Sequence, residues 1–360
     1  MERLDAAVAE VDWTGFRATP FGPLPALGAS LGFQDGAVWV KDDTANVGGS
    51  HKARHLMGIL LHLEVVEALG WGTAPRLAIA SCGNAALAAA VVARAAERPL
   101  RVFIPTSADP VVVTKLDALG ADIRECERVR GESGDPAFLR FEEDVAAGAL
   151  PFCVQGPANG LTLEGGQTLG WEMGAVLRRE GVVLDHLVVQ VGGGALASAC
   201  VRAFEQMVAL GVLPHMPAIH TVQTSGGYPL ARAFERVRVR AAEHGAEEAL
   251  RHAASHRSEY MWPWETEPKS IAHGILDDET YDWHRVVAGM LATSGEAVVV
   301  SEETLAHAHR LARVIAEIPA SATGTSGLAG LVELRRTGRI RPDERVAVLL
   351  TGVERTGPDT

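Results

Sequence analysis

Residues 188–199 read Val-Val-Gln-Val-Gly-Gly-Gly-Ala-Leu-Ala-Ser-Ala. The apolar run at the start predicts a buried strand, and the small residues at the end predict the beginning of a helix. The three glycines between them predict a loop whose backbone can approach a ligand closely. A glycine loop that leads into a helix N-terminus is a common way to bind phosphate. The stretch therefore predicts a strand–loop–helix unit of an α/β fold that holds a phosphate group.

The same stretch also satisfies a loose dinucleotide-binding pattern, GxGxxA, through Gly192, Gly194 and Ala197. That pattern needs a carboxylate at the end of the next strand, about 20 residues further on, to bind the ribose. The next predicted strand ends at residues 220–224, about 30 residues on, without an acidic side chain. The glycines therefore fit a single phosphate better than a dinucleotide, although an NAD-dependent oxidoreductase stays open as an alternative.

Short apolar runs alternate with helical stretches along the chain, and this alternation is typical of parallel sheets covered by helices on both faces. Residues 127–159 carry little periodicity, and we expect the chain to cross there between two lobes. The fold class that we predict is α/β with a mostly parallel sheet in each lobe. The predicted strands are 38–41, 76–80, 100–104, 121–126, 185–191, 218–223 and 345–350, and the clearest predicted helices are 51–68 and 84–96.

Composition excludes several classes of protein. The chain has 360 residues and a formal net charge of −12, which disfavours binding to nucleic acid or to anionic membrane surfaces. It has no apolar stretch long enough to cross a membrane and no signal-peptide pattern at its start. The four cysteines, Cys82, Cys126, Cys153 and Cys200, are widely spaced and are expected to be free thiols. These features predict a cytoplasmic globular protein.

A second glycine-bearing segment, residues 43–54, delivers Lys52 to the start of a predicted helix. The positive end of the helix dipole lowers the pKa of a lysine and favours the neutral amine. A neutral amine can condense with an aldehyde to form a Schiff base. The alternative is an ordinary surface lysine beside a helix cap formed by Ser50.

Two further segments carry polar groups at predicted strand ends. Ser81, Cys82, Gly83 and Asn84 follow the strand 76–80 in a tight turn before a helix, which suits the binding of a carboxylate. Thr351, followed by Gly352, ends the last strand and can offer a neutral hydrogen bond to a ring nitrogen. A simple helix cap and a simple strand-end turn are the respective alternatives.

The four segments, in this order, resemble the tryptophan-synthase-β family of pyridoxal-phosphate (PLP) enzymes, also called fold type II. The resemblance covers about residues 18–355 and includes the stretch 164–170, EGGQTLG. It implies a smaller, mobile domain at 38–149 and a larger phosphate-binding domain formed by 1–37 and 150–360. It also implies roles for individual residues: Lys52 binds the cofactor covalently, Asn84 contacts its 3′-oxygen, Gly192, Gly193, Gly194, Ala195 and Leu196 cradle its phosphate, Thr351 faces its ring nitrogen, and Ser81, Cys82, Gly83 and Ala85 line the substrate-carboxylate loop.

The resemblance implies β-elimination or β-replacement, because a neutral hydroxyl at the ring nitrogen suits these reactions better than transamination or decarboxylation. Residues 268–275, PKSIAHGI, resemble threonine synthases and threonine dehydratases, whereas His51 before the lysine resembles tryptophan synthase β. We expect an ammonia-lyase that acts on a small β-hydroxy or β-substituted amino acid, and a homodimer. A threonine-synthase-like replacement enzyme and a non-catalytic amino-acid binder are alternatives.

Two other features of the sequence say less about function. The histidine pairs His51/His55 and His252/His256 have a spacing that could hold zinc, but neither is followed by the glutamate of a metalloprotease motif, and we expect no metal site. Trp262 and Trp264 flank a proline and form either an aromatic wall over a pocket or an ordinary packing corner.

Overall fold

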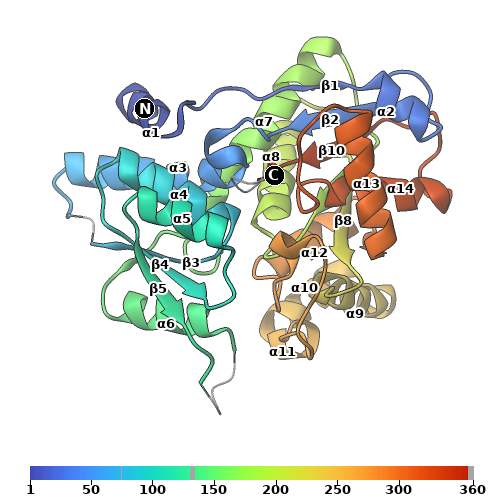
Figure 1. Cartoon of the computed structure of the whole chain (residues 1–360). Helices are drawn as coiled ribbons and strands as arrows, with labels where there is room; N and C mark the ends of the chain where they lie inside the picture. The colour runs from blue at the N-terminus through green and yellow to red at the C-terminus, as the bar shows by residue number, and fades with distance from the viewer. Residues whose placement is uncertain (74, 130–133, 356–360) are drawn as a thin grey trace. The chain divides into compact units, whose positions relative to one another are not determined.

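Two β-sheets organise the chain, and each belongs to a separate compact unit (Figure 1). The structure is a computed structural model that describes residues 1–73, 75–129 and 134–355. The first unit contains residues 1–17 and 45–166, and the second contains residues 18–44 and 167–355. The helix α7 (Leu161–Glu180) begins in the first unit and ends in the second.

The sheet of the first unit has the strand order β5-β4-β3-β6, and all its paired strands run parallel. Its strands are β3 (Leu77–Ala80), β4 (Leu100–Pro105), β5 (Asp122–Cys126) and β6 (Leu150–Pro151). Its helices are α1 (Glu2–Asp12), the 3-10 turn η1 (Val47–Gly49), α3 (Lys52–Ala68), α4 (Asn84–Ala95), α5 (Pro110–Ala118) and α6 (Pro136–Ala146).

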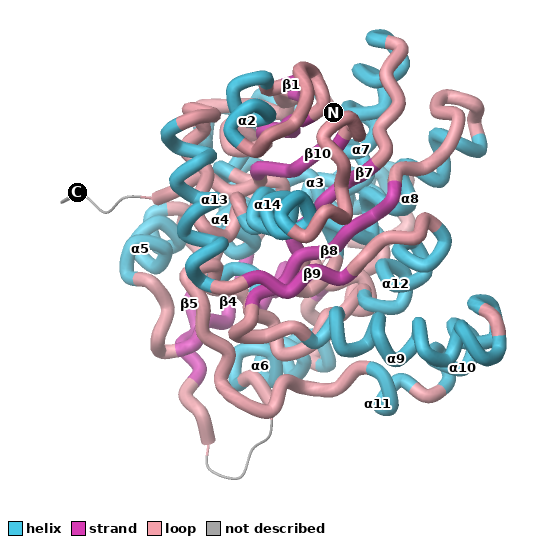
Figure 2. The backbone as a smooth tube through the Cα atoms, turned by 90° about the vertical axis from the view of Figure 1, so that its right-hand side faces the viewer, coloured by secondary structure: helices cyan, strands magenta, loops and turns pink. Residues whose placement is uncertain are grey.

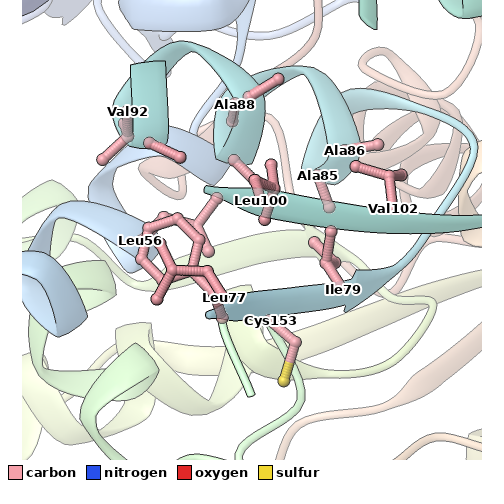
Figure 3. Packing of buried hydrophobic residues seen from close by; sticks show 14 of the residues in the cluster. Leu56, Leu77, Ile79, Ala85, Ala86, Ala88, Val92, Leu100, Val102 and Cys153 are labelled. Atoms are coloured by element: carbon pink, nitrogen blue, oxygen red, sulfur yellow. The ribbon is translucent and has the colours of Figure 1, made fainter. Parts of the chain in front are cut away.

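Alanine makes the core of this unit compact. The helix α4 reads NAALAAAVVARA, and its alanines let the helix lie close to both the sheet and α3. In Figure 3, Leu56 of α3, Val92 of α4 and Leu77 of β3 are among the residues that fill the same apolar cluster. Ala88 is fully buried in this cluster. The absence of larger side chains brings the helices close together, and close packing keeps their N-termini fixed.

The segment 127–159 is more regular than the sequence predicts. It contains α6, which contacts β3, β4 and β5, and the short strand β6. Asp135 caps α6 by accepting a hydrogen bond from the N–H of Ala137, and Pro136 occupies the first helical position. The sequence contains this helix-start signal at Asp135 and Pro136. The helix that follows it is short, with 11 residues. Residues 130–133 of this segment lie outside the described residues.

The sheet of the second unit has the order β1-β2-β10-β7-β8-β9, with only β1 antiparallel to its neighbour among the described pairs. Its strands are β1 (Phe21–Pro23), β2 (Val38–Asp42), β7 (His186–Gln190), β8 (Ala218–Thr224), β9 (Ala297–Val300) and β10 (Val346–Leu350). Its helices are α2 (Pro25–Ser30), α8 (Ala195–Ala209), α9 (Pro229–His244), α10 (Ala246–Ser255), α11 (Arg257–Tyr260), the 3-10 turn η2 (His273–Ile275), α12 (Trp283–Ala292), α13 (Glu302–Val314) and α14 (Ser326–Arg336).

Helices cover both faces of this second sheet, which explains why the central strands β7, β8 and β10 are buried along almost their whole length. All five residues of β10 are buried. Figure 2 shows α13 and α14 on one face, and these helices pack in one apolar cluster with Val348 and Leu350. The residues of α8, α9 and α12 form a second cluster with Leu187 and Val189 on the opposite face.

The α/β class and the mostly parallel sheets are thus confirmed, with every predicted strand present to within a residue at each end. The prediction lacks β1, β6 and β9, which have two to four residues each. Such short strands depend on pairing with a neighbour rather than on their own pattern. Among the described residues, no helix is both long enough and apolar enough to cross a membrane.

Candidate active site

Lys52 is the first residue of α3 and follows a turn that glycine makes possible. Gly48 and Gly49 both have φ of +66°, a left-handed conformation that glycine adopts without strain. The turn is held by the side-chain amide of Asn46, which donates to the carbonyl of Ser50 at 2.8 Å. The Ser50 hydroxyl accepts from the backbone N–H of Lys52 at 3.4 Å. The backbone of this turn therefore fixes Lys52 at the start of the helix, where the sequence predicts it.

The turn before Lys52 lies against the first turns of α4. A Cβ on Gly48 would stand only 3.3 Å from the Cα of Ala88, a tight contact, and the left-handed backbone at this position also favours glycine. The N–H of Gly48 donates to a carboxylate oxygen of Asp12 at 2.7 Å, which fixes the turn from its other side. Because Ala88 lies one turn after Asn84, the first unit brings the lysine turn and the start of α4 together.

Residues 81–83 connect β3 to α4 in a tight turn. The Ser81 hydroxyl accepts from the N–H of Gly83 at 3.4 Å, and the N–H of Ser81 donates to the carbonyl of Phe103 on the neighbouring strand. Gly83 is the N-cap of α4 and has no side chain with which to cap it. The first turn of the helix therefore presents backbone N–H groups of the kind that bind an anion. This geometry fits the carboxylate loop better than the side-chain-capped alternative.

His55 lies one turn after Lys52 and is fully buried. Its Nδ1 donates to the carbonyl of Thr162 at 2.8 Å, which assigns the proton to Nδ1. Burial, and to a lesser extent the positive charge of Lys52, lower the pKa of His55 to about 3. The ring of His55 meets that of His51 edge-on, with centroids 5.6 Å apart. His55 is thus a neutral structural side chain at the base of the lysine turn.

The glycine loop of the second unit follows β7 and leads into α8. Gly194 is the N-cap of α8 with φ of +95°, and α8 begins at Ala195. Thr280 donates from Oγ1 to the carbonyl of Gly192 at 2.9 Å, and the N–H of Asp282 donates to the carbonyl of Gly193 at 3.0 Å. The carbonyls of the loop are thereby occupied, whereas the N–H groups of the first turn of α8 have no acceptor within the helix.

Gly192 and Gly194 leave room for the segment that lies over the loop. A Cβ on Gly192 would stand 2.9 Å from the Cα of Ile275 and would collide with the carboxylate of Asp277. A Cβ on Gly194 would stand 2.9 Å from the methyl group of Thr280. The loop is therefore a backbone cradle of fixed shape at the carboxyl end of β7. Its donors and its position fit a phosphate group.

Thr351 follows β10, the strand next to β7, and so lies at the same edge of the sheet as the glycine loop. It is buried, and its Oγ1 accepts a hydrogen bond of 2.7 Å from Nε2 of Gln190, the last residue of β7. The second unit therefore brings the predicted phosphate loop and the predicted ring-nitrogen partner to neighbouring strand ends. Ligands of open parallel sheets bind at this edge.

Sequence reasoning missed Gln190, Thr280 and Asp282, which hold the site residues in place. Thr280 and Asp282 lie in an acidic stretch without a recognisable motif, so no signal pointed to them. Gln190 lies inside the quoted stretch, where a polar residue in a buried strand was a usable signal. Trp262 and Trp264 stack on the guanidinium of Arg232, at 3.6 and 5.0 Å from its carbon, which fits the packing corner better than the pocket wall.

Comparison with known proteins shows the family to which the chain belongs. Residues 13–352 match the family described as "Pyridoxal-phosphate dependent enzyme". The chain is 24% identical over 343 residues to a threonine synthase of Methanocaldococcus jannaschii, covering 95% of this chain and 75% of that protein. It is 30% identical over 206 residues to an L-serine dehydratase of Saccharomyces cerevisiae, covering 55% of this chain and 59% of that one.

Solved structures show the same fold. A threonine deaminase from T.th. superposes with a TM-score of 0.70 at 21% identity and covers 99% of both chains. A fungal L-serine ammonia-lyase from Rhizomucor miehei superposes with a TM-score of 0.68 at 18% identity and covers 94% of both chains. At such identities the likeness concerns the fold alone. The family match, however, covers nearly the whole chain, and this chain belongs to the pyridoxal-phosphate-dependent enzymes of fold type II.

Proposed function

We propose that the protein is a PLP-dependent ammonia-lyase that eliminates the β-substituent of a small β-hydroxy amino acid, with Lys52 as the residue that binds the cofactor. The observation that carries the proposal is the fixed turn of Gly48–Ser50, which delivers Lys52 to the N-terminus of α3 beside the anion-binding start of α4. Family membership supplies the cofactor. When bound, PLP supplies an aldehyde that bonds to amines and a ring that accepts the electron pair left on the α-carbon.

Lys52 has two roles in this proposal. Its Nζ would hold the cofactor covalently, and as a free, uncharged amine it would remove the proton from the substrate α-carbon. A base must be uncharged to accept a proton. The dipole of α3 supports the uncharged form, since Lys52 lies at the positive end of that helix.

The remaining site residues bind and orient. In our proposal the N–H groups of Gly193, Gly194, Ala195 and Leu196 hold the phosphate, and those of the Ser81–Ala85 turn hold the substrate carboxylate. Asn84 contacts the cofactor 3′-oxygen. Thr351 would face the ring nitrogen and offer it a neutral hydrogen bond. A neutral partner at that nitrogen would suit elimination of the β-substituent.

A second candidate function is β- or γ-replacement. It is favoured by the threonine synthases, whose similarity extends over 95% of this chain, whereas that to the serine dehydratase covers 55%. Elimination needs only one substrate. A dehydratase, a deaminase and an ammonia-lyase are among the proteins that this chain is similar to. We therefore place elimination first.

The test is a pair of lysine variants. The wild-type protein is expected to be yellow, to become permanently labelled at Lys52 after reduction with borohydride, and to release ammonia and a 2-oxo acid from L-serine or L-threonine. Lys52→Ala is expected to lose the label and to lose at least about a thousandfold in rate, since covalent catalysis and proton transfer are both removed. Lys115→Ala, which removes an exposed lysine of α5, is the matched control.

Two outcomes would contradict the proposal. A colourless protein that takes up no added PLP would overturn the assigned site. A yellow protein that releases ammonia only when a second substrate is present would favour the replacement reaction. We further propose that the protein is a homodimer in the cytoplasm, which light scattering on the purified protein and localisation of a tagged chain would check.

A further inference from the structure

Gln190 is a buried polar side chain that the roles above do not use. It ends β7, has an exposed fraction of only 4%, and lies two residues before the glycine loop. A glutamine buried in a sheet costs free energy unless its amide is hydrogen-bonded. The hydrogen bonds of the Gln190 amide therefore indicate the function of this side chain.

The surroundings of Gln190 determine which end of the amide faces Thr351. The atom nearest Thr351 Oγ1, at 2.7 Å, also lies 3.3 Å from two backbone carbonyl oxygens, those of Gly324 and Leu349. Carbonyl oxygens only accept hydrogen bonds, so this atom must be the Nε2 donor and not the Oε1 acceptor.

This orientation fixes the role of the Thr351 hydroxyl. Because Gln190 Nε2 only donates, Thr351 Oγ1 accepts, and its own proton is directed to another acceptor. Within the described part of the chain, the structure shows no acceptor for that proton. A buried hydroxyl with an uncommitted proton is a donor prepared for a ligand.

The helix that packs over Gln190 preserves the arrangement. Gly327 lies in the first turn of α14, and a Cβ there would stand 2.7 Å from Oε1 of Gln190 and 3.2 Å from the carbonyl oxygen of Val188. Any larger residue at position 327 would displace the amide. The glycine therefore lets α14 lie against the amide without displacing it.

We propose that Gln190 is a positioning residue that sets the Thr351 hydroxyl as a hydrogen-bond donor and thereby selects a cofactor whose ring nitrogen carries no proton. The proposal rests on the proposed function, in which Thr351 faces that nitrogen. It goes beyond that function because it assigns the protonation state of the ring to a residue that does not touch the cofactor.

The first experiment uses the wild-type holoenzyme. Loaded with PLP labelled with ¹⁵N at the ring, it is expected to give the resonance of an unprotonated pyridine nitrogen at neutral and at mildly alkaline pH. A protonated nitrogen would require Thr351 to accept rather than donate, and would overturn the proposal without any variant.

The second experiment measures binding with two probes, PLP and an analogue that has C–H in place of the ring nitrogen. The wild type is expected to prefer PLP by about tenfold, the size of one hydrogen bond. Gln190→Met is expected to reduce this preference to about threefold or less. Thr351→Val is expected to abolish it, and adding Gln190→Met to Thr351→Val should change nothing further.

Gln223→Met is the matched control, because Gln223 is also a buried glutamine at the end of a neighbouring strand. Its Oε1 accepts from the N–H groups of Leu230 and Ala231, away from Thr351. Gln223→Met should lose stability but keep the tenfold preference. If all variants bind PLP and discriminate equally, the inference on Gln190 fails while the proposed function stands. If the wild type binds no PLP at Lys52, the proposed function itself fails.

Discussion

Among individual side chains, Lys52 and His55 show how the first unit keeps a lysine near a neutral imidazole. His55 is buried one turn after the lysine on α3, and its Nδ1–H is used by the carbonyl of Thr162. A protonated imidazole there would repel the lysine and lie without solvent. The depressed pKa of His55, about 3, shows that burial keeps it neutral, and this has a consequence for stability.

Stability is expected to fall as the pH drops below the unfolded pKa of His55. Above pH 6.5 both states are neutral at this residue, whereas between 6.5 and about 3 only the unfolded chain binds the proton. The free energy of unfolding should therefore decrease by about 1.4 kcal/mol per pH unit in that window, or by about 2 kcal/mol between pH 7 and pH 5. His55→Asn, which keeps a donor for Thr162, should lose this contribution in urea unfolding.

His220 provides the comparison. Burial lowers its pKa to about 4, so it adds a contribution of the same sign between pH 6.5 and about 4. It lies in the second unit, on β8, and should be unaffected by the His55 variant. An identical pH dependence in wild type and His55→Asn would show that His55 titrates normally.

Among the secondary-structure elements, the glycine loop and the segment 275–282 pack together as one structural unit. The segment occupies the space where side chains of residues 192–194 would be, and it binds the loop carbonyls through Thr280 and Asp282. The helix α8 then begins directly at the loop, which leaves its first N–H groups for a phosphate. Shape and charge of the cradle thus depend on two elements that are far apart in the sequence.

Gly192→Ala is expected to disrupt the cradle, because its Cβ would collide with Asp277 and Ile275. We expect a loss of about 1–3 kcal/mol of stability and at least about a tenfold weaker affinity for PLP. Gly22→Ala on β1 is the matched control in the same unit, since a Cβ there meets nothing within 4 Å. Differential scanning calorimetry and PLP titration check both variants, and equal behaviour of the two would refute the role of the cradle.

For the chain as a whole, cofactor and fold are linked thermodynamically. A ligand that binds the native but not the unfolded chain stabilises the native chain according to its concentration and affinity. Residues assigned to PLP occur in both compact units, Lys52 in the first and Thr351 in the second. Binding should therefore raise the unfolding temperature of the chain as a whole.

At a hundredfold excess of PLP over its dissociation constant, we expect about 2.7 kcal/mol of stabilisation. Thermal unfolding of the PLP-free and PLP-saturated protein measures it. Lys52→Ala should keep only the part that comes from phosphate and ring contacts, whereas Gly22→Ala should behave as wild type. A melting temperature that does not respond to PLP would contradict the cofactor linkage.

Much of this protein can be predicted from its amino-acid order alone. Buried strands such as 346–350 and helices such as 84–95 follow from apolar patterning and alanine content, which are local properties. The lysine turn and the glycine loop can also be predicted, because the left-handed backbone at residues 48, 49 and 194 favours glycine. The order of these motifs along the chain is by itself enough to indicate the family.

How those motifs are held became visible only in the folded chain. The bond from Gln190 to Thr351 joins residues 161 positions apart, and the donor role of the hydroxyl follows from two carbonyls that no sequence pattern places nearby. The cover of 275–282 over the glycine loop and the neutral state of His55 likewise depend on packing. Local patterns report what a backbone can adopt, whereas proton positions and charge depend on neighbours that meet only when the sheets form.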